Sequence, residues 1–113
     1  MEPRQYDLGQ KKCLPCEGGI AVLSADEAND LLAQVSGWEI VGIKLIRQFL
    51  FKNHYEASAF VNAIVFVSHK ENHHPYITFG FKDVRVEYWT HAVDGLTEND
   101  FICATKVNKL LED

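Results

Sequence analysis

The chain has 113 residues, of which 47% are apolar and 12% aromatic, and a formal net charge of -5. This length suits one domain with its own hydrophobic core, and the composition argues against disorder. The acidic balance and the lack of a Lys/Arg cluster argue against a nucleic acid or an anionic membrane as partner. No apolar run approaches the roughly 18 residues of a membrane-spanning helix, and no apolar signal region follows Met1, so we expect a soluble cytoplasmic protein.

Residues 1–23 have no clear periodicity and are predicted to be a leader before a single domain over residues 24–113. The leader contains a C-x-x-C motif, Cys13 and Cys16, and the third cysteine is Cys103. An odd number of cysteines without a secretion signal argues against a disulfide framework. One C-x-x-C provides only half of a zinc site, so we interpret Cys13 and Cys16 as incidental or as a local clamp. Metal or redox use is the less favoured alternative.

Three helices are predicted from capping pairs that precede apolar residues at helical spacing. In each pair, a side chain at the helix start can accept a hydrogen bond from the backbone N–H three residues later. The pairs and the helices that they open are Ser24 with Glu27 for residues 25–36, Asn53 with Glu56 for 54–71, and Thr97 with Asp100 for 98–111.

Four strands are predicted between these helices from short apolar runs and period-two alternation, over residues 38–41, 44–52, 76–81 and 84–90. The element order is therefore α-β-β-α-β-β-α. Two hairpins separated by helices indicate an α+β, two-layer domain in which three helices pack on one face of a four-stranded antiparallel sheet. Tyr76, Phe79 and Trp89 are expected to be core or interface residues.

The stretch Asn72-His73-His74-Pro75 places two imidazoles at a predicted corner of the chain. A proline disfavours the helical region for the residue before it, so His74 should be extended while His73 belongs to the end of the second helix. The two rings should therefore enter one space from two different elements. Histidine titrates nearest to neutral pH and can both donate and accept a proton.

Two further side chains are expected to converge on this corner. His91 lies at the end of the fourth predicted strand, and Asp100 lies in the first turn of the third helix. The sequence therefore predicts a metal-free acid–base site. For the histidines together, a functional and a structural interpretation are evenly balanced, because a histidine near a helix C-terminus also complements the helix dipole. Asp100 has a structural role of its own as the partner of Thr97, and His54 is expected at the surface.

A metal site is a second hypothesis. His69 and His73 are four residues apart and share a helix face, and His74 or His91 would supply a third ligand. The H-E-x-x-H arrangement is absent from the sequence, so metal binding is less favoured.

Cys103 lies among the apolar residues of the third predicted helix and should be buried and inert. Neither a G-x-S-x-G motif, a phosphate loop nor a dinucleotide fingerprint occurs, which favours a proton transfer without a cofactor.

From residue 24 onward the chain resembles the pterin-4a-carbinolamine dehydratases. The resemblance rests on Asn72-His73-His74-Pro75, on His91 in Tyr88-Trp89-Thr90-His91, and on the segment Gly95–Phe101 that contains Asp100. Gly37-Trp38-Glu39 and Phe49-Leu50-Phe51-Lys52 also match, and the cysteine-containing leader resembles those of bacterial members more loosely. One departure is His69, where the family often has an acidic residue.

The resemblance implies a lyase that dehydrates 4a-hydroxytetrahydropterin to quinonoid dihydropterin, in the recycling of the tetrahydrobiopterin cofactor of aromatic amino-acid hydroxylases. It implies that His73, His74 and His91 line the pterin site and that Asp100 orients an imidazole. We expect His73 and His91 to share the acid and base roles and His74 to hold the pterin ring. Asn72 and Thr90 are candidate polar contacts to the pterin.

The family also implies a homodimer or homotetramer, with no nucleic acid, membrane or cofactor among its partners. Two alternatives to this enzyme stay open. Mammalian members also act as a dimerisation cofactor of a transcription factor, so the chain could be a binding module of the coactivator type. It could also keep the fold and act on another pterin, such as one in molybdopterin metabolism.

Overall fold

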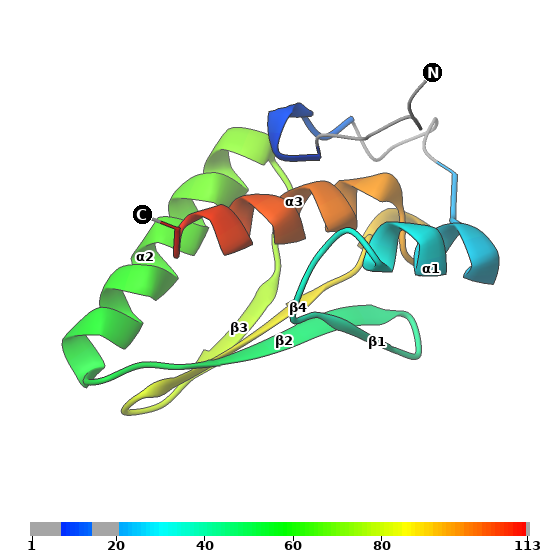
Figure 1. Ribbon diagram of the computed structural model, residues 1–113. Coiled ribbons are helices and arrows are strands. Elements are labelled where there is room, and N and C mark those ends of the chain that lie inside the picture. The colour runs from blue at the N-terminus through cyan, green and yellow to red at the C-terminus, as the bar shows by residue number, and fades with distance from the viewer. Residues whose placement is uncertain (1–7, 15–20, 113) are drawn as a thin grey trace, which may run out of the picture.

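The structure, a computed structural model, describes residues 8–14 and 21–112 (Figure 1). The elements are η1 (Leu8–Gln10), α1 (Ala25–Leu32), β1 (Glu39–Val41), β2 (Lys44–Leu50), α2 (His54–Glu71), β3 (Tyr76–Phe79), β4 (Asp83–Tyr88), η2 (His91–Val93) and α3 (Glu98–Lys109). The strands form one antiparallel sheet in the order β1-β2-β4-β3. The three α-helices lie on one face of this sheet, so the predicted α+β fold is confirmed. In the described part of the chain, no helix has the length and apolar character needed to cross a membrane.

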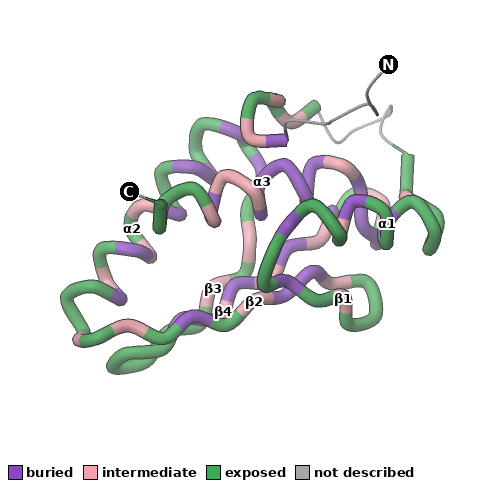
Figure 2. Tube along the Cα trace, in the orientation of Figure 1, coloured by how far each residue is buried: buried purple, intermediate pink, exposed green. Residues whose placement is uncertain are grey.

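The core lies between the sheet and the helices. Alternate residues of the central strands point to this side, and Val84, Val86 and Tyr88 of β4 are each 0% exposed. The register pairs Tyr88 with Leu45 and Val84 with Phe49 of β2, which are buried as well. Figure 2 shows the corresponding buried positions along the facing side of the helices. This alternation is the period-two pattern that the sequence predicted.

The second helix has the bounds that its capping signal and periodicity predicted. The Asn53 side chain accepts a hydrogen bond from the Glu56 amide at 2.9 Å, which caps the start of α2. Asn72 ends the helix in the left-handed conformation, with φ 53°, a position that asparagine tolerates better than most residues. The amide of His73 also bonds back to the Ser68 carbonyl, at 3.3 Å. His73 therefore lies immediately after the helix, and the turn at Asn72 directs it inward.

Two predicted helices are shorter than expected. The first ends at Leu32 instead of residue 36, because the amides of Gln34 and Val35 bond to the carbonyls three residues back, at 2.9 and 3.1 Å. These tighter turns continue to Gly37, whose φ of 88° favours glycine. The third helix ends at Lys109 instead of residue 111.

The prediction that His91 ends a strand over residues 84–90 is wrong. β4 ends at Tyr88, and Thr90 forms an isolated antiparallel bridge with Gly95. The short loop between them contains η2 and turns at Asp94, which has a φ of 52°. This closed loop removes residues 89–91 from the sheet, so His91 begins a 3-10 turn.

Two other side chains were wrongly predicted as core residues. Tyr76 is 58% exposed and Phe79 is 42% exposed. Both belong to β3, which is an edge strand with a neighbour on one side only. Apolar residues on such a strand have fewer partners to cover them than residues on the central strands.

The described part of the leader packs against α3 and the end of α2 (Figure 1). The Cys13 amide donates to Glu71 Oε1 at 2.9 Å, and Leu14 and the Asn99 side chain exchange two hydrogen bonds of 2.9 and 2.8 Å. Burial alone would raise the pKa of Glu71, but the bond from Cys13 and the charge of Lys106 outweigh it, so this pKa is lowered. The contact is therefore charged at neutral pH and weakens only as the pH falls through that lowered pKa. Cys16 lies outside the described residues.

The Tyr88 hydroxyl gives a test of the core. Among the described residues it is a buried side-chain oxygen without a hydrogen-bond partner, and burial raises the pKa of this phenol well above its ordinary value. A buried unsatisfied hydroxyl costs about 1–3 kcal/mol. Tyr88→Phe is therefore expected to unfold at the same temperature as the parent protein or higher. Phe101→Ala, at another fully buried ring, should lower the free energy of unfolding by about 3–5 kcal/mol. A marked loss of stability in Tyr88→Phe would contradict the absence of a stabilising hydrogen bond at the Tyr88 hydroxyl.

Candidate active site

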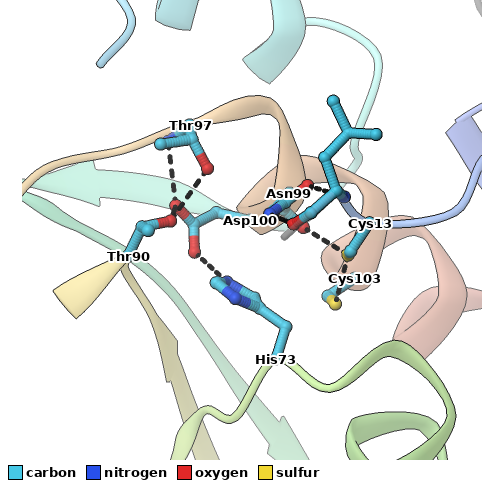
Figure 3. Close-up of polar contacts among 8 residues, drawn as sticks. Cys13, His73, Thr90, Thr97, Asn99, Asp100 and Cys103 are labelled. Carbon is cyan, nitrogen blue, oxygen red and sulfur yellow. Dashed lines mark hydrogen bonds and ion pairs between the residues drawn. The ribbon is translucent and has the colours of Figure 1, made fainter. Parts of the chain in front are cut away.

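A buried histidine–carboxylate pair lies behind the sheet end at which β4 finishes. His73 Nε2 is 2.6 Å from Asp100 Oδ1, and the two side chains are 5% and 0% exposed (Figure 3). An ionised carboxylate can only accept hydrogen bonds, so Nε2 is the ring nitrogen that carries the proton. In the neutral ring, Nδ1 is then the nitrogen with the basic lone pair.

The second oxygen of Asp100 is held by two donors. The Thr90 hydroxyl and the Thr97 amide donate to Asp100 Oδ2, each at 2.9 Å, and the two threonine hydroxyls are 2.8 Å apart. A buried carboxylate is costly unless its oxygens are hydrogen-bonded, and here both oxygens are. Asp100 caps the start of α3 and contacts His73 at the same time, so its local and its long-range role coexist.

The His73 ring is also fixed by stacking. It lies parallel to the Tyr88 ring, with an angle of 4° between the planes and 5.8 Å between the centroids. Tyr88 is the last residue of β4, and His73 follows α2, so this contact joins the sheet to the helix end. The Asp100 bond at one edge and the Tyr88 ring at one face leave the imidazole little rotational freedom.

His91 is exposed and lies on an aromatic surface. Its ring is 4.3 Å from the Trp89 ring and 5.8 Å from the Tyr76 ring, and the Lys44 ammonium lies 4.7 Å from the Trp89 centroid. Trp89 was expected in the core or at an interface; it is half-buried, packs against the edge of the core and also contacts His91.

The two exposed imidazoles each follow a member of the buried cluster in sequence. His74 comes directly after His73, and His91 comes directly after Thr90. Their backbones are therefore adjacent to those of the buried cluster, with neighbouring Cα atoms about 3.8 Å apart. Asn72 is exposed at the helix end. The structure thus joins His73, Thr90 and Asp100 by contact, while the convergence of all the histidines on one cleft stays a prediction.

The alternative metal site requires His69, which is exposed on α2. Among the residues that the structure describes, no group of three or more His, Cys, Asp and Glu side chains is placed to hold a metal ion. His54 is exposed as expected, and its Nδ1 lies 2.9 Å from the Phe81 carbonyl.

A surface hollow of about 330 Å³ lies away from the histidines, between α1 and the start of α3. Its lining contains Glu27, Asp30 and Glu98 but no imidazole. We place the candidate chemistry at the His73–Asp100 pair, because the lining of the hollow includes no histidine, the side chain whose ordinary pKa lies nearest to neutral pH.

Two contributors to the site were missed from the sequence. The Thr97 hydroxyl was considered only as a helix cap, yet it lies 2.8 Å from the Thr90 hydroxyl. Tyr88 was predicted only as part of the fourth strand, and its stacking on His73 carried no signal in the sequence. Both contacts depend on how distant segments meet.

Comparison with known proteins assigns the chain to a family. The profile of the family described as Pterin 4 alpha carbinolamine dehydratase matches residues 21–110. A protein of Dechloromonas aromatica, provisionally named pterin-4-alpha-carbinolamine dehydratase, is 58% identical over 106 residues, which cover 94% of this chain and 95% of the relative. A similarly named protein of Nitrosomonas eutropha is 53% identical over 106 residues, covering 93% and 94%.

The fold has solved counterparts as well. The crystal structure of a transcriptional coactivator/pterin dehydratase from Brucella melitensis matches with a TM-score of 0.77 and 30% identity, over 80% of this chain and 98% of that one. A pterin dehydratase-like protein, identified as a RuBisCO assembly factor in the alpha-carboxysome, matches with a TM-score of 0.56 and 25% identity, over 67% and 88%. By sequence and by fold, this chain belongs to the pterin-4-alpha-carbinolamine dehydratase family.

Proposed function

We propose that this protein dehydrates 4a-hydroxytetrahydropterin to quinonoid dihydropterin, in the recycling of tetrahydrobiopterin or a related pterin, by histidine acid–base catalysis. The observation that supports this proposal most is the buried His73–Asp100 pair, with its 2.6 Å contact. Membership of the family gives the reaction class, and the pair gives a proton-transfer group with a fixed orientation.

The chemistry requires two proton transfers. In a carbinolamine, the lone pair of the adjacent nitrogen helps to expel the hydroxyl group once its oxygen is protonated. A base then removes a proton from a ring nitrogen to give the quinonoid product and water. The substrate supplies the electron pair itself, so neither an oxidant nor a reductant is needed. Each positioned acid or base contributes about 10²–10⁴-fold to the rate.

In this proposal, His73 and His91 share the acid and base roles. Asp100 holds the proton on Nε2 of His73, which keeps Nδ1 as the basic nitrogen. His91 is exposed on its aromatic surface, where a flat pterin ring can reach it. His74 holds the pterin ring, and the exposed Asn72 is a candidate polar contact. Thr90 is 1% exposed and bonded to Asp100, which favours a positioning role over direct contact with substrate.

We expect His73→Ala and His91→Ala each to lower the dehydration rate by about tenfold or more while the fold is retained, because each removes one proton-transfer group. The rate is measured on freshly formed 4a-hydroxytetrahydropterin from the absorbance of the quinonoid product, and circular dichroism checks the fold. His69→Ala is the matched control, since His69 is exposed on α2 and has no part in the proposed chemistry. Full activity in both the His73 and the His91 variant would end the acid–base proposal.

The same assay separates the alternative functions. A rate abolished by a chelator, together with stoichiometric metal that is lost in His69→Ala, would favour the metalloprotein. Turnover of a different pterin with no rate on the carbinolamine would favour a role elsewhere in pterin metabolism.

Asp100→Asn tests whether the carboxylate positions His73. The Asn oxygen can satisfy Thr90 and the Thr97 amide only by turning its NH₂ group toward His73 Nε2, which must then accept a hydrogen bond. We expect the His73 proton to move to Nδ1, as seen in ¹⁵N–¹H spectra of the imidazole, and the rate to fall by about tenfold or more.

Thr90→Val is the control for the Asp100 variant. It removes one donor to Asp100 and should cost about 1 kcal/mol of stability while the proton stays on Nε2, and Thr90→Ser should restore that loss. If Asp100→Asn leaves both the tautomer and the rate unchanged, Asp100 has no positioning role.

A homodimer or homotetramer is the second part of the proposal, and the exposed side of α2 supports it. Tyr55, Ala59, Asn62 and Phe66 fall on one face of the helix by their spacing, and Tyr55 and Phe66 are 85% and 63% exposed. Tyr55 and Phe66 are thus two large, exposed aromatic side chains on this face, and exposed apolar surface of this kind is typical of an interaction site. The same surface would serve a binding module, and the two solved relatives are described as a transcriptional coactivator and as a RuBisCO assembly factor.

Phe66→Glu should convert the oligomer to a smaller species, because it replaces an exposed aromatic side chain of this surface with a charge. Light scattering coupled to gel filtration measures the mass, and Leu111→Glu, at an exposed position of the C-terminus, is the matched control. A parent protein that is monomeric at micromolar concentration would contradict the oligomer. A stable partner in a pull-down combined with no dehydratase rate would favour the binding module over the enzyme.

A further inference from the structure

Two cysteines from opposite ends of the chain lie in contact behind the candidate site. The sulfur atoms of Cys13 in the leader and Cys103 in α3 are 3.5 Å apart, and both are free thiols (Figure 3). Neither residue has a role in the proposed catalysis. We infer that Cys13 and Cys103 form a reversible disulfide that ties the leader to α3. This inference does not rest on the proposed function.

The backbone around Cys13 is held in place without the thiol. Its amide donates to Glu71 Oε1 at 2.9 Å, and the next residue, Leu14, exchanges two hydrogen bonds with the Asn99 side chain. Asn99 lies four residues before Cys103, one turn earlier on α3. Two successive turns of α3 therefore meet the leader: the first binds it through Asn99, and the second presents the Cys103 sulfur to it.

The remaining movement is small. A disulfide bond is about 2.05 Å long, so the two sulfurs need to approach by roughly 1.5 Å. Rotation of the two cysteine side chains supplies movement of this size, while the contacts of Glu71 and Asn99 hold the leader against α2 and α3. The folded protein therefore prepares the pair, although 90 residues separate the two positions in sequence.

The environments of the two thiols determine the order of the chemistry. Cys13 is half-buried and can meet a reagent from solvent, whereas Cys103 is 0% exposed. The hydrogen bond with Cys13 and burial raise the pKa of Cys103, so this thiol stays protonated and reacts poorly on its own. The expectation that Cys103 is buried is confirmed, but Cys13 offers its sulfur a reaction partner inside the protein.

The oxidant in this scheme is a small disulfide such as oxidised glutathione. The Cys13 thiolate attacks one sulfur of glutathione disulfide, which forms a mixed disulfide and releases one glutathione thiolate. Cys103 loses its proton as it attacks the Cys13 sulfur, which forms the Cys13–Cys103 bond and expels the second glutathione. Two protein thiols are thereby oxidised by two electrons, and one glutathione disulfide is reduced to two thiols.

The covalent tie would act on the segment that carries the candidate site. Cys103 lies three residues after Asp100, on the next turn of α3. A bond between two residues that are 90 positions apart in sequence restricts the unfolded chain strongly and stabilises the fold. The oxidised protein should therefore resist heat better and keep its leader on the domain.

The decisive experiment maps the bond in the full-length protein. The purified chain is equilibrated with oxidised and reduced glutathione, its remaining thiols are alkylated, and a non-reducing protease digest is read by mass spectrometry. We expect a crosslinked peptide pair that contains Cys13 and Cys103. Cys16→Ser should retain this crosslink, and the Cys16→Ser/Cys103→Ser double variant should lose it and accumulate glutathione on Cys13. A digest in which Cys13 pairs only with Cys16, or a Cys16→Ser protein without any crosslink, would overturn the inference.

Thermal unfolding gives a second measurement. In the Cys16→Ser background, the oxidised protein should melt about 5–15 °C above the reduced protein, and dithiothreitol should reverse the shift. The Cys16→Ser/Cys103→Ser double variant should melt at the same temperature in both redox states. Equal melting temperatures for oxidised and reduced Cys16→Ser protein would show that the leader is not tied to α3.

Discussion

The buried carboxylate of Asp100 is the constraint on which the candidate site depends. An ionised carboxylate in the protein interior is stable only if donors surround it. Here three donors do so, and they come from three segments: His73 after α2, Thr90 after β4, and the Thr97 amide at the start of α3. The requirement to satisfy one charge thus holds together the end of α2, the start of α3 and the segment that follows β4, and it fixes one imidazole in a single orientation.

The rest of the fold delivers these segments to the same place. The antiparallel pairing of β2 with β4 directs β4 toward the end of the sheet where the chain leaves it at Tyr88. The left-handed turn at Asn72 directs His73 back toward that same end, where the Tyr88 ring supports it. Burial of the apolar face provides the stability, and the few polar contacts at the sheet end determine the geometry. The leader adds a second set of polar contacts, in which the Cys13 and Leu14 amides donate hydrogen bonds to the side chains of Glu71 and Asn99.

The local features of the sequence predicted most of the architecture. The capping pair at Asn53 and the apolar spacing behind it gave the bounds of α2, and the alternation of Val84, Val86 and Tyr88 gave the buried face of β4. These signals are reliable because they depend on interactions within one turn or one strand. The predictions failed where a longer contact decides the outcome, as at the bridge between Thr90 and Gly95, which ends β4 early.

The candidate site shows the same division. The sequence by itself determined the fold class, the family resemblance and the residue types available for proton transfer, since each of these follows from spacing and side-chain chemistry. The sequence predicted that Asp100 approaches the histidines, and only the tertiary structure decided that its partner is His73, that Trp89 contacts His91, and that Cys13 lies against Cys103. These pairs join residues whose contacts depend on the path of the chain through space. Hydrogen bonds and sulfur contacts act over a few ångströms, and the packing of helices on the sheet sets which distant side chains come that close.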